Sequence, residues 1–526
     1  MKRAFLSTSA ILLALAVTGC ATEPPQGLKQ AYVPSNFTAP VSADAPLWPQ
    51  ADWWKGFDSD ELNGFIATAQ ADNLDIANAV GVVLQAEGNA EAAGAPLFPQ
   101  IGLDGGVTRS RSAVSSLTTV PGVAFPKSTN NSFSAGLNGT WALDIWGKAQ
   151  DDLRAANEQV KSSLYAREGV ALTVTAGVGT TYLDVLALRE RVAIAQSNID
   201  AAKRILTITQ AKVTNGVSSR LDLAQQEAQV DTQEASIPPL IEQEREARYA
   251  LAILLGKLPE GFDVQAKNLD AIVGPTVRPG LPSELLRRRP DVAQAEANLA
   301  AAHANVDAAR AAFFPQIGLT GSAGYGSGAL KSLISNSNLA WSIGASLAQT
   351  IFDGGALEGN LHVTKAQQIQ VLATYRKTVL SAFSDVETSL GQVSALTKQE
   401  KLETQAANAA AEAFRISEIQ YREGVTDLLT VLTAQQTLFT AQDTLVQIKS
   451  ARLQADVNLF KALGGGWTEA DIEATQTIPT ATTATAPSSE PGPGQQPASS
   501  IPTTPGPTTV PGEPTVTPTP PRHPHG

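Results

Sequence analysis

The sequence predicts a mostly α-helical protein with a membrane β-barrel, built from two structural repeats. Three observations support this fold class. The chain contains an internal duplication, each copy opens with two segments of alternating apolar and polar residues, and each copy continues as long proline-poor runs with apolar residues at seven-residue spacing. Alternation with period two is typical of strands, and a seven-residue spacing is typical of coiled-coil helices.

The duplication sets the boundaries of the repeats. Leu97–Leu103 (LFPQIGL) recurs 216 residues later as Phe313–Leu319 (FFPQIGL), whereas Gly216 and Gly424 occupy matching turns 208 residues apart. The eight-residue difference indicates a longer loop in the first copy, and residues 113–131, rich in Ser, Thr, Pro and Gly, form that loop. The predicted parts are a signal peptide at 1–19, an N-terminal linker and first repeat at 20–280, a second repeat at 281–466, and a disordered tail rich in Pro, Thr and Ser at 467–526.

Each repeat begins with two predicted strands. The four strands cover about residues 99–111, 132–145, 315–327 and 339–352. In the last strand Trp341 and Ile343 alternate with Ser342, and Trp141 lies on the apolar face of the second strand. A β-sandwich shows similar alternation, but here the polar face is small and glycine-rich, as in the wall of a membrane barrel. We expect Trp141, Trp341 and Ile343 to face lipid.

Four strands cannot enclose a water-filled pore by themselves. An open sheet edge within hydrocarbon leaves backbone N–H and C=O groups without partners, and each such group costs several kcal/mol. The chain must therefore oligomerise until the sheet closes. Three copies give a 12-stranded trimeric β-barrel, which lies within the size range of such barrels.

The remainder of each repeat, about residues 148–256 and 355–463, is predicted to form long antiparallel coiled-coil helices. In the first repeat the seam residues are Val178, Val185, Val192, Ile199, Leu206 and Val213. In the second repeat the same seven-residue step relates Leu432, Phe439, Val446, Leu453 and Phe460. Such a run spans roughly 100 Å at 1.5 Å per residue, far more than a compact domain needs. The heptads alone fit a soluble coiled-coil tether equally well.

Glycine and proline mark the ends and the irregular points of these helices. Asn215 with Gly216, and Gly424 in the second copy, are predicted to form the hairpin tips, because glycine adopts positive φ without strain. Pro238 and Pro239 lie inside a predicted helix of the first copy only. Since proline removes a donor and clashes with the preceding turn, we expect a bend or an irregular segment there.

The N-terminus predicts export and lipid attachment. Lys2 and Arg3 precede a short apolar region, which ends in Val17-Thr18-Gly19-Cys20. This pattern is a signal peptide, too short to span a bilayer as a mature helix. An aliphatic residue, two small residues and a cysteine resemble a lipobox, so Cys20, the only cysteine in the chain, becomes the acylated N-terminus. The alternative is a chance cysteine near a cleavage site.

The composition excludes several functional classes. The net charge is −12, or −14 after loss of Lys2 and Arg3, which is too acidic for a nucleic-acid partner. No stretch after the signal peptide has the apolar length of a membrane-spanning helix. The sequence holds no nucleophile–base pair, phosphate loop or metal-ligand spacing, and His303 and His362 are isolated. We therefore expect neither an enzyme nor a bound cofactor.

Several motifs carry a resemblance to a known family. These are Trp53-Trp54, the two Phe-Pro-Gln segments, Ile237-Pro238-Pro239-Leu240, Leu285-Leu286-Arg287-Arg288-Arg289-Pro290-Asp291-Val292 and Tyr421-Arg422-Glu423-Gly424-Val425. Over about residues 45–465 the chain resembles the TolC-like outer membrane factor family, and more narrowly its lipoprotein, NodT-type branch. The resemblance implies a homotrimer in outer-membrane lipid, a periplasmic α-barrel, a girdling equatorial region, and two partners, a periplasmic adaptor and an inner-membrane pump.

The resemblance also implies a gate where the hairpin tips meet. By position the gate residues are Tyr421, Leu429, Thr433 and Gln436; many relatives carry Asp and Arg where this chain has Thr433 and Gln436, so the usual charged latch is missing. Asp222 and Asp427 are the remaining acidic candidates near the tips. In a trimer each forms a ring of three like charges, which attracts cations and raises the pKa of its members. The alternative is that both carboxylates simply stabilise a helix N-terminus.

These observations together predict a passive outer-membrane channel subunit of a tripartite, RND-type efflux system for small toxic compounds or drugs. The sole methionine is Met1, so the methionine-rich relay of copper and silver exporters is missing. The alternatives are the duct of a type I secretion system and a structural periplasmic coiled-coil lipoprotein. A tether has no use for amphipathic strands, and this feature favours the channel.

Overall fold

The structure is a computed structural model that describes residues 34, 36–38, 48–111, 129–277, 279–280, 282–465 and 467. The chain divides into two contact units, Met1–Thr475 and Gln476–Gly526, and every described residue belongs to the first unit. Cys20, the predicted signal peptide and the predicted tail beyond Trp467 lie outside the described residues.

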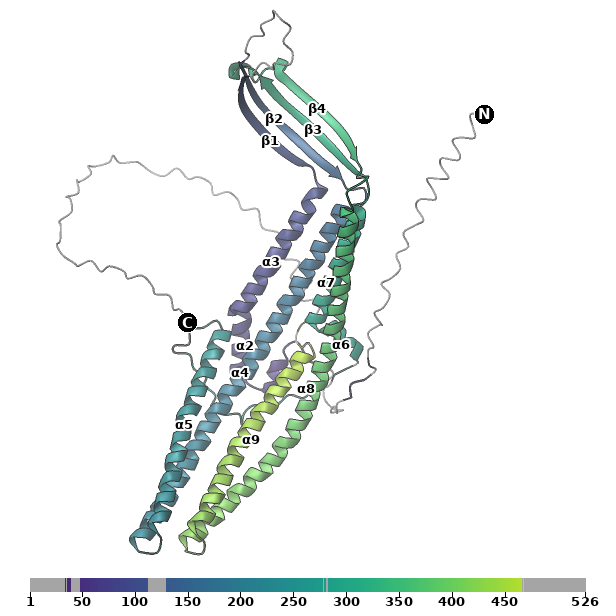
Figure 1. The fold of residues 1–526 in the computed structure, drawn as a ribbon. Helices are drawn as coiled ribbons and strands as arrows, with labels where there is room; N and C mark the ends of the chain where they lie inside the picture. The colour runs from purple at the N-terminus through teal and green to yellow at the C-terminus, as the bar shows by residue number, and fades with distance from the viewer. Residues whose placement is uncertain are drawn as a thin grey trace, which may run out of the picture. The chain divides into compact units, whose positions relative to one another are not determined.

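Four strands form one antiparallel sheet in chain order (Figure 1). They are β1 (Gln100–Arg111), β2 (Thr129–Leu143), β3 (Gln316–Ser327) and β4 (Leu339–Ala348). β2 begins earlier than expected, because its pairing with β1 extends to Thr129 opposite Arg111. β4 ends at Ala348, four residues before the expected end. Its partner there is Gln316, and the preceding Pro315 has no N–H with which to extend the ladder.

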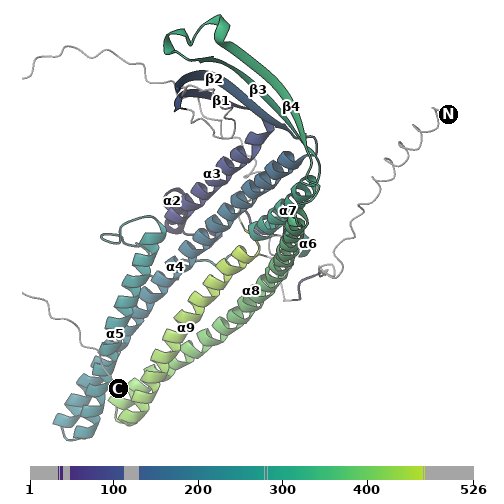
Figure 2. The same ribbon diagram turned by 45° about the horizontal axis from the view of Figure 1, so that its top comes forward.

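The helices account for most of the described chain. The long ones are α4 (Lys148–Thr214), α5 (Arg220–Leu254), α8 (Ala356–Arg422) and α9 (Leu428–Ala462). The shorter ones are α2 (Asp60–Asp72), α3 (Leu74–Gly94), α6 (Pro282–Arg288) and α7 (Pro290–Ala311), with 3-10 turns η1 (Trp53–Phe57), η2 (Ala95–Leu97), η4 (Leu330–Ser332) and η5 (Asn336–Asn338). α4 with α5 and α8 with α9 form two hairpins, which touch through α4 and α9 (Figure 2). The predicted class of two repeats with long antiparallel helices and four strands is confirmed.

The predicted heptad seams form the cores of the hairpins. Every seam residue of both repeats is buried or half-buried. Val178 and Val185 of α4 are fully buried, and so is Leu453 of α9. Because hydrophobic burial is the main favourable contribution to folding, the seven-residue spacing explains both the length of these helices and their pairing.

α5 runs without a break through Pro238 and Pro239, so no irregular segment is present there. Both prolines are exposed, and so are Glu234 and Ala235, whose carbonyls lose their intrahelical donors. Water can satisfy carbonyls on an exposed face, which removes most of the penalty that we expected from the pair.

The apolar character of α4 contradicts a second expectation from the sequence. Among the described residues, α4 alone contains an 18-residue stretch that is long and apolar enough to cross a membrane, although the sequence was expected to contain none after the signal peptide. In the structure 56% of that stretch is buried within the chain. α4 packs against α2, α5, α7 and α9, so its apolar residues reflect a central position among the helices.

The first residue of the predicted tail is ordered. The indole N–H of Trp467 donates to the carbonyl of Arg288 at 2.8 Å, and its ring makes an edge contact with Tyr165. The folded part of the chain therefore extends to at least Trp467, one residue further than the composition indicated.

Candidate functional site

One face of the sheet is apolar across all four strands. Residues paired between antiparallel strands point to the same side. One row across the sheet consists of Leu103, Leu137, Ala323 and Trp341, and the adjacent row on the opposite face consists of Gly102, Asn138, Ser322 and Ser342. The hydroxyl oxygens of Ser322 and Ser342 lie 2.9 Å apart. The register therefore separates an apolar surface from a hydroxyl- and amide-bearing one.

The apolar surface is uncovered within the described chain. Trp341 is 72% exposed and Ile343 is 82% exposed. Trp141 lies on the same face, half-buried, with its indole N–H donating to the carbonyl of Leu97 at 3.2 Å. Apolar surfaces of this extent mark contact with a partner or a membrane.

Both edges of the sheet are open. β1 and β4 each pair on one side only in the described part of the chain, and every residue of both strands is exposed. Free N–H and C=O groups on an edge pair readily with another strand. The sheet of one chain is therefore an incomplete structure.

The hairpin tips have closely similar geometry. Gly216 and Gly424 have φ of +72° and +79°, as expected for glycine turns between antiparallel helices. Asn215 ends α4, and its side-chain amide donates to the carbonyl of Ala211 at 2.7 Å. Val217 and Val425, which follow the two glycines, are both 73% exposed. Each tip thus presents a small apolar residue to its surroundings.

Asp222 and Asp427 both stabilise helix N-termini. Asp222 accepts hydrogen bonds from the hydroxyl of Ser218 at 2.6 Å and the backbone N–H of Ser219 at 2.9 Å. Asp427 accepts from the hydroxyl of Thr430 at 2.7 Å and its N–H at 2.9 Å. These bonds lower the pKa of both carboxyls, and the bonds from the hydroxyl groups have the largest effect. Within one chain the capping role explains both residues, and it opposes the rise in pKa expected from a ring of like charges.

Tyr421 lies in the contact between the two hairpins. It is 3% exposed, and its hydroxyl is 2.9 Å from the hydroxyl of Thr209 on α4. The ammonium group of Lys212 lies 4.4 Å from the centre of the Tyr421 ring and also donates to its carbonyl. The structure therefore separates Tyr421 from the other gate candidates, because it joins α8 to α4.

Leu429, Thr433 and Gln436 share one exposed face of α9. Leu429 is 65% exposed. The hydroxyl of Thr433 donates to the carbonyl of Leu429 at 2.9 Å. The side chain of Gln436 accepts from Gln229 of α5 at 3.4 Å. Thr433 and Gln436 line a cleft of about 710 Å³ between α5 and α9. From Leu428 to Gln442 this helix has no charged residue.

Further polar contacts join the hairpins away from the tips. Arg191 of α4 forms a salt bridge with Asp443 of α9 at 2.6 Å, and the amide of Asn198 donates to Gln442 at 3.1 Å. The partners are separated by more than 240 residues, and no local pattern in the sequence could have paired them.

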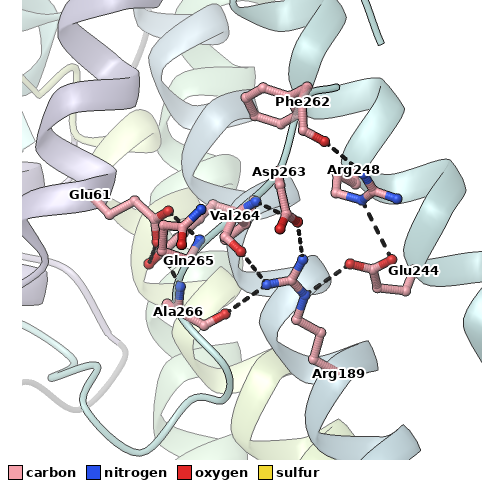
Figure 3. Close-up of polar contacts among 10 residues, drawn as sticks. Glu61, Arg189, Glu244, Arg248, Phe262, Asp263, Val264, Gln265 and Ala266 are labelled. Carbon is pink, nitrogen blue, oxygen red and sulfur yellow. Dashed lines mark hydrogen bonds and ion pairs between the residues drawn. The ribbon is translucent and has the colours of Figure 1, made fainter. Parts of the chain in front are cut away.

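A belt of irregular chain together with η1 and α2 crosses the long helices. We use this name for residues 36–38, 48–72 and 255–277. Figure 3 shows how Arg189 of α4 holds it: the guanidinium donates to Asp263 at 2.6 Å and to the carbonyl of Ala266 at 3.0 Å, and it also donates to Glu244 of α5 at 2.9 Å. Desolvation opposes the charge of Arg189, but the acidic partners more than compensate and raise its pKa. The hydrogen bond from Arg189 lowers the pKa of Asp263.

Glu61 joins the N-terminal part of the belt to its inter-repeat part. Its carboxylate accepts from the backbone N–H groups of Gln265 at 2.6 Å and Ala266 at 3.1 Å (Figure 3). The hydroxyl of Tyr182 on α4 donates to the same carboxylate at 3.1 Å, and burial raises the pKa of Tyr182 to about 12. The belt is thus fixed by charge-assisted bonds, which are stronger than neutral ones.

The arginine cluster of the sequence has a structural place. Arg289 precedes α7 and is 8% exposed, with salt bridges to Asp291 at 2.7 Å and Asp385 at 3.0 Å and a hydrogen bond to the carbonyl of Ala462 at 3.1 Å. It therefore ties α7 to α8 and to the end of α9. The described residues contain no group of three or more His, Cys, Asp or Glu side chains that could hold a metal ion.

Comparison with known proteins identifies the family. The family described as outer membrane efflux protein matches residues 65–257 and 281–465. The chain belongs to this family. OpmQ of Pseudomonas aeruginosa, a pyoverdine export outer membrane protein, is 41% identical over 415 residues, which are 79% of this chain and 87% of OpmQ. TtgC of Pseudomonas putida, a probable efflux pump outer membrane protein, is 30% identical over 477 residues, which are 88% of this chain and 97% of TtgC.

Solved structures agree with this assignment. The outer-membrane channel OprN aligns with a TM-score of 0.76 at 27% identity, over 83% of this chain and 98% of OprN. The predicted TolC-like family and fold are confirmed. The protein is an outer-membrane efflux channel with a large periplasmic part.

Proposed function

We propose that three copies of the chain close into one 12-stranded β-barrel continuous with an α-barrel of the long helices. The observation that carries this proposal is the sheet itself, which has two free edges, one exposed apolar face and one hydroxyl-bearing face. In hydrocarbon such edges must pair, and the copies of the chain itself are the matching partners. Trp141, Trp341 and Ile343 then face lipid, and Ser322 and Ser342 face the pore.

The proposed attachment to the membrane has a second component. Acylation of Cys20 after removal of residues 1–19 gives the trimer three acylated N-termini. A single acyl chain binds a membrane only weakly, so the barrel supplies most of the attachment and the lipids support it.

The proposed partners are a periplasmic adaptor and an RND-type inner-membrane pump. The exposed valines Val217 and Val425 at the two tips offer matching apolar contacts for an adaptor. The channel is passive in this scheme. The polar contacts between the hairpins, such as Thr209 with Tyr421, are the ones that must change when the tips separate.

The proposed cargo is a small toxic compound or drug. Both relatives named above are export or efflux proteins, and their names refer to small molecules or to a pump rather than to a secreted protein. This supports efflux over type I secretion. A structural tether is disfavoured because it leaves the amphipathic sheet without a purpose.

Native mass spectrometry of the detergent-extracted protein tests the assembly. We expect a species of three acylated chains, and a monomer or a dimer as the main species would contradict the proposal. In cells that lack the chain, restored expression should lower the accumulation of a fluorescent dye that the pump exports. The variant Ile343→Arg, which cannot insert, should fail to do so, while Ser342→Arg should succeed.

A further inference from the structure

A long polar groove lies between α7 and α8. One cavity of about 900 Å³ is lined by one face of each helix. A second cavity of about 460 Å³ continues toward α4 and the end of α9. Arg289, Asp291 and Asp385 line both cavities, so the two form a single groove.

The lining of this groove is almost free of large apolar side chains. On α8 the lining residues run from Thr364 to Gln392 and are mostly Thr, Ser and Gln. This stretch is about 42 Å long at 1.5 Å per residue. On α7 the polar lining residues include Gln294, Asn298 and Asn305, and alanines between them leave the space open. The groove thus offers many hydrogen-bond donors and acceptors to a solute.

The groove lies on the side of the helices opposite to the belt. On α8, Glu387 accepts from the backbone N–H of Thr38, whereas Asp385 lines the groove. Successive residues of an α-helix are rotated by 100° about its axis, so these two side chains, two residues apart, point about 160° away from each other. On α4, Tyr182 contacts the belt and Thr173 lines the groove. These residues are nine positions apart, so their side chains point to opposite sides of the helix.

α9 shows the same division. Phe460 stacks on Trp53 of the belt with ring centres 5.0 Å apart, whereas Asn458 lines the groove. On α4, α8 and α9, therefore, the belt covers one side of the helix and the groove opens on the other. In the proposed trimer the belt surrounds the tube, so the groove faces the lumen.

The groove also carries an unbalanced positive charge. Arg289 pairs with both Asp291 and Asp385, and the two lysines of the lining give the five charged residues a net charge of 3 − 2 = +1. Lys377 and Lys461 are exposed on the groove lining, and neither has a salt-bridge partner among the residues that the structure describes. In a chain of net charge −12 this local excess is unexpected. A trimer presents three copies of each lysine around the lumen, which attracts anions.

We propose that this groove is a binding site for the exported solute and that it selects organic anions rich in hydroxyl or amide groups. The inference rests on the proposed channel function and adds a substrate class to it. Lys377 and Lys461 attract and orient the anion through charge-assisted hydrogen bonds. The Thr, Ser, Gln and Asn side chains replace the water that the solute loses, and the wide groove keeps binding weak enough for release.

Citrate, a hydroxyl-bearing trianion, is a suitable probe in planar lipid bilayers. Citrate added at low salt to the barrel side should block the current of the wild-type channel, while neutral sorbitol and cationic spermidine at equal concentration should not. The double variant Lys377→Glu/Lys461→Glu should need at least about tenfold more citrate for the same block, because the loss of even one charge-assisted hydrogen bond accounts for about that factor. Lys377→Gln/Lys461→Gln should be intermediate.

Lys401→Glu is the matched control. Lys401 is exposed and lies nine residues beyond Gln392, on the opposite face of α8. Its citrate block should equal that of the wild type. Absence of citrate block in a conducting wild-type channel, or equal block in the double Glu variant, would overturn the proposed site and leave the channel function standing. A protein that forms no pore would refute the channel function and this inference with it.

Discussion

A charge on the lipid side of β4 should prevent assembly, whereas the same charge one residue away should not. Ile343 is 82% exposed on the apolar face, opposite Gly321 of β3. Ser342 lies on the other face, opposite Ser322. Ile343→Arg and Ser342→Arg therefore introduce the same side chain on the same strand but into different surroundings.

The expected costs differ by an amount that can be measured. An arginine on the lipid face costs about 2–4 kcal/mol at the middle of the membrane and falls to about 0–1 kcal/mol near the interfaces. The trimer carries the substitution three times, so the penalty on the assembled barrel is about threefold larger. Ser342→Arg points into water and loses only the hydroxyl contact to Ser322, a net effect of about 1 kcal/mol.

Urea-induced unfolding of the protein refolded into lipid vesicles measures this difference. Ile343→Arg should either fail to fold or unfold at clearly lower urea concentration, and Trp341→Arg should behave in the same way. Ser342→Arg should stay close to the wild type. If substitutions on the two faces proved equally damaging, the assignment of the apolar face to lipid would be wrong.

Three other predictions follow from individual residues. Cys20→Ala should abolish labelling with radioactive palmitate and reduce the amount of protein in the membrane; normal labelling would exclude acylation at Cys20. Thr433→Cys gives one free thiol per acylated chain, and a short reducible crosslinker should stop dye efflux until it is reduced; full efflux after efficient crosslinking would show that Thr433 does not line the moving constriction. Burial raises the pKa of Asp456 to about 7, so the native state binds a proton that the unfolded chain releases near pH 3.8, and stability falls as the pH rises from about 4 to 7. Asp456 also forms a salt bridge with Arg452 at 3.0 Å, which Asn cannot keep, so the pH dependence carries the test. The melting temperature of Asp456→Asn relative to wild type should be higher at pH 8 than at pH 5, by an effect on the order of 1–4 kcal/mol, and a pH-independent difference in circular-dichroism melting would contradict this assignment.

The features that the sequence predicts well are those set by local periodicity. The strand containing Trp341 alternates with period two, and the helix containing Val178 and Val185 repeats every seven residues. Burial depends directly on these periods, so the apolar sheet face and the hairpin cores follow from them. Gly216 and Gly424 were also predictable, because positive φ at a tight turn strongly favours glycine.

The features that could not be predicted depend on distant partners. Arg189 binds belt residues more than 70 positions away, and Tyr421 is buried by a contact with Thr209 across 212 positions. The resemblance to the family grouped Tyr421 with Thr433 as a gate residue. The burial of Tyr421, however, depends on the packing of α4 against α8 and α9. The irregular segment considered at Pro238 and Pro239 is missing for a related reason, since the cost of the two prolines depends on whether the neighbouring carbonyls reach water.

In the proposed assembly three incomplete sheets close around a water-filled pore. Single-channel recording of the purified wild-type protein in planar lipid bilayers tests it most directly. We expect discrete conductance steps of uniform size, which are retained in Ser342→Arg and lost in Ile343→Arg. A trimer that associates stably with the membrane but shows no conductance, even when the hairpin tips are separated, would contradict the proposed pore.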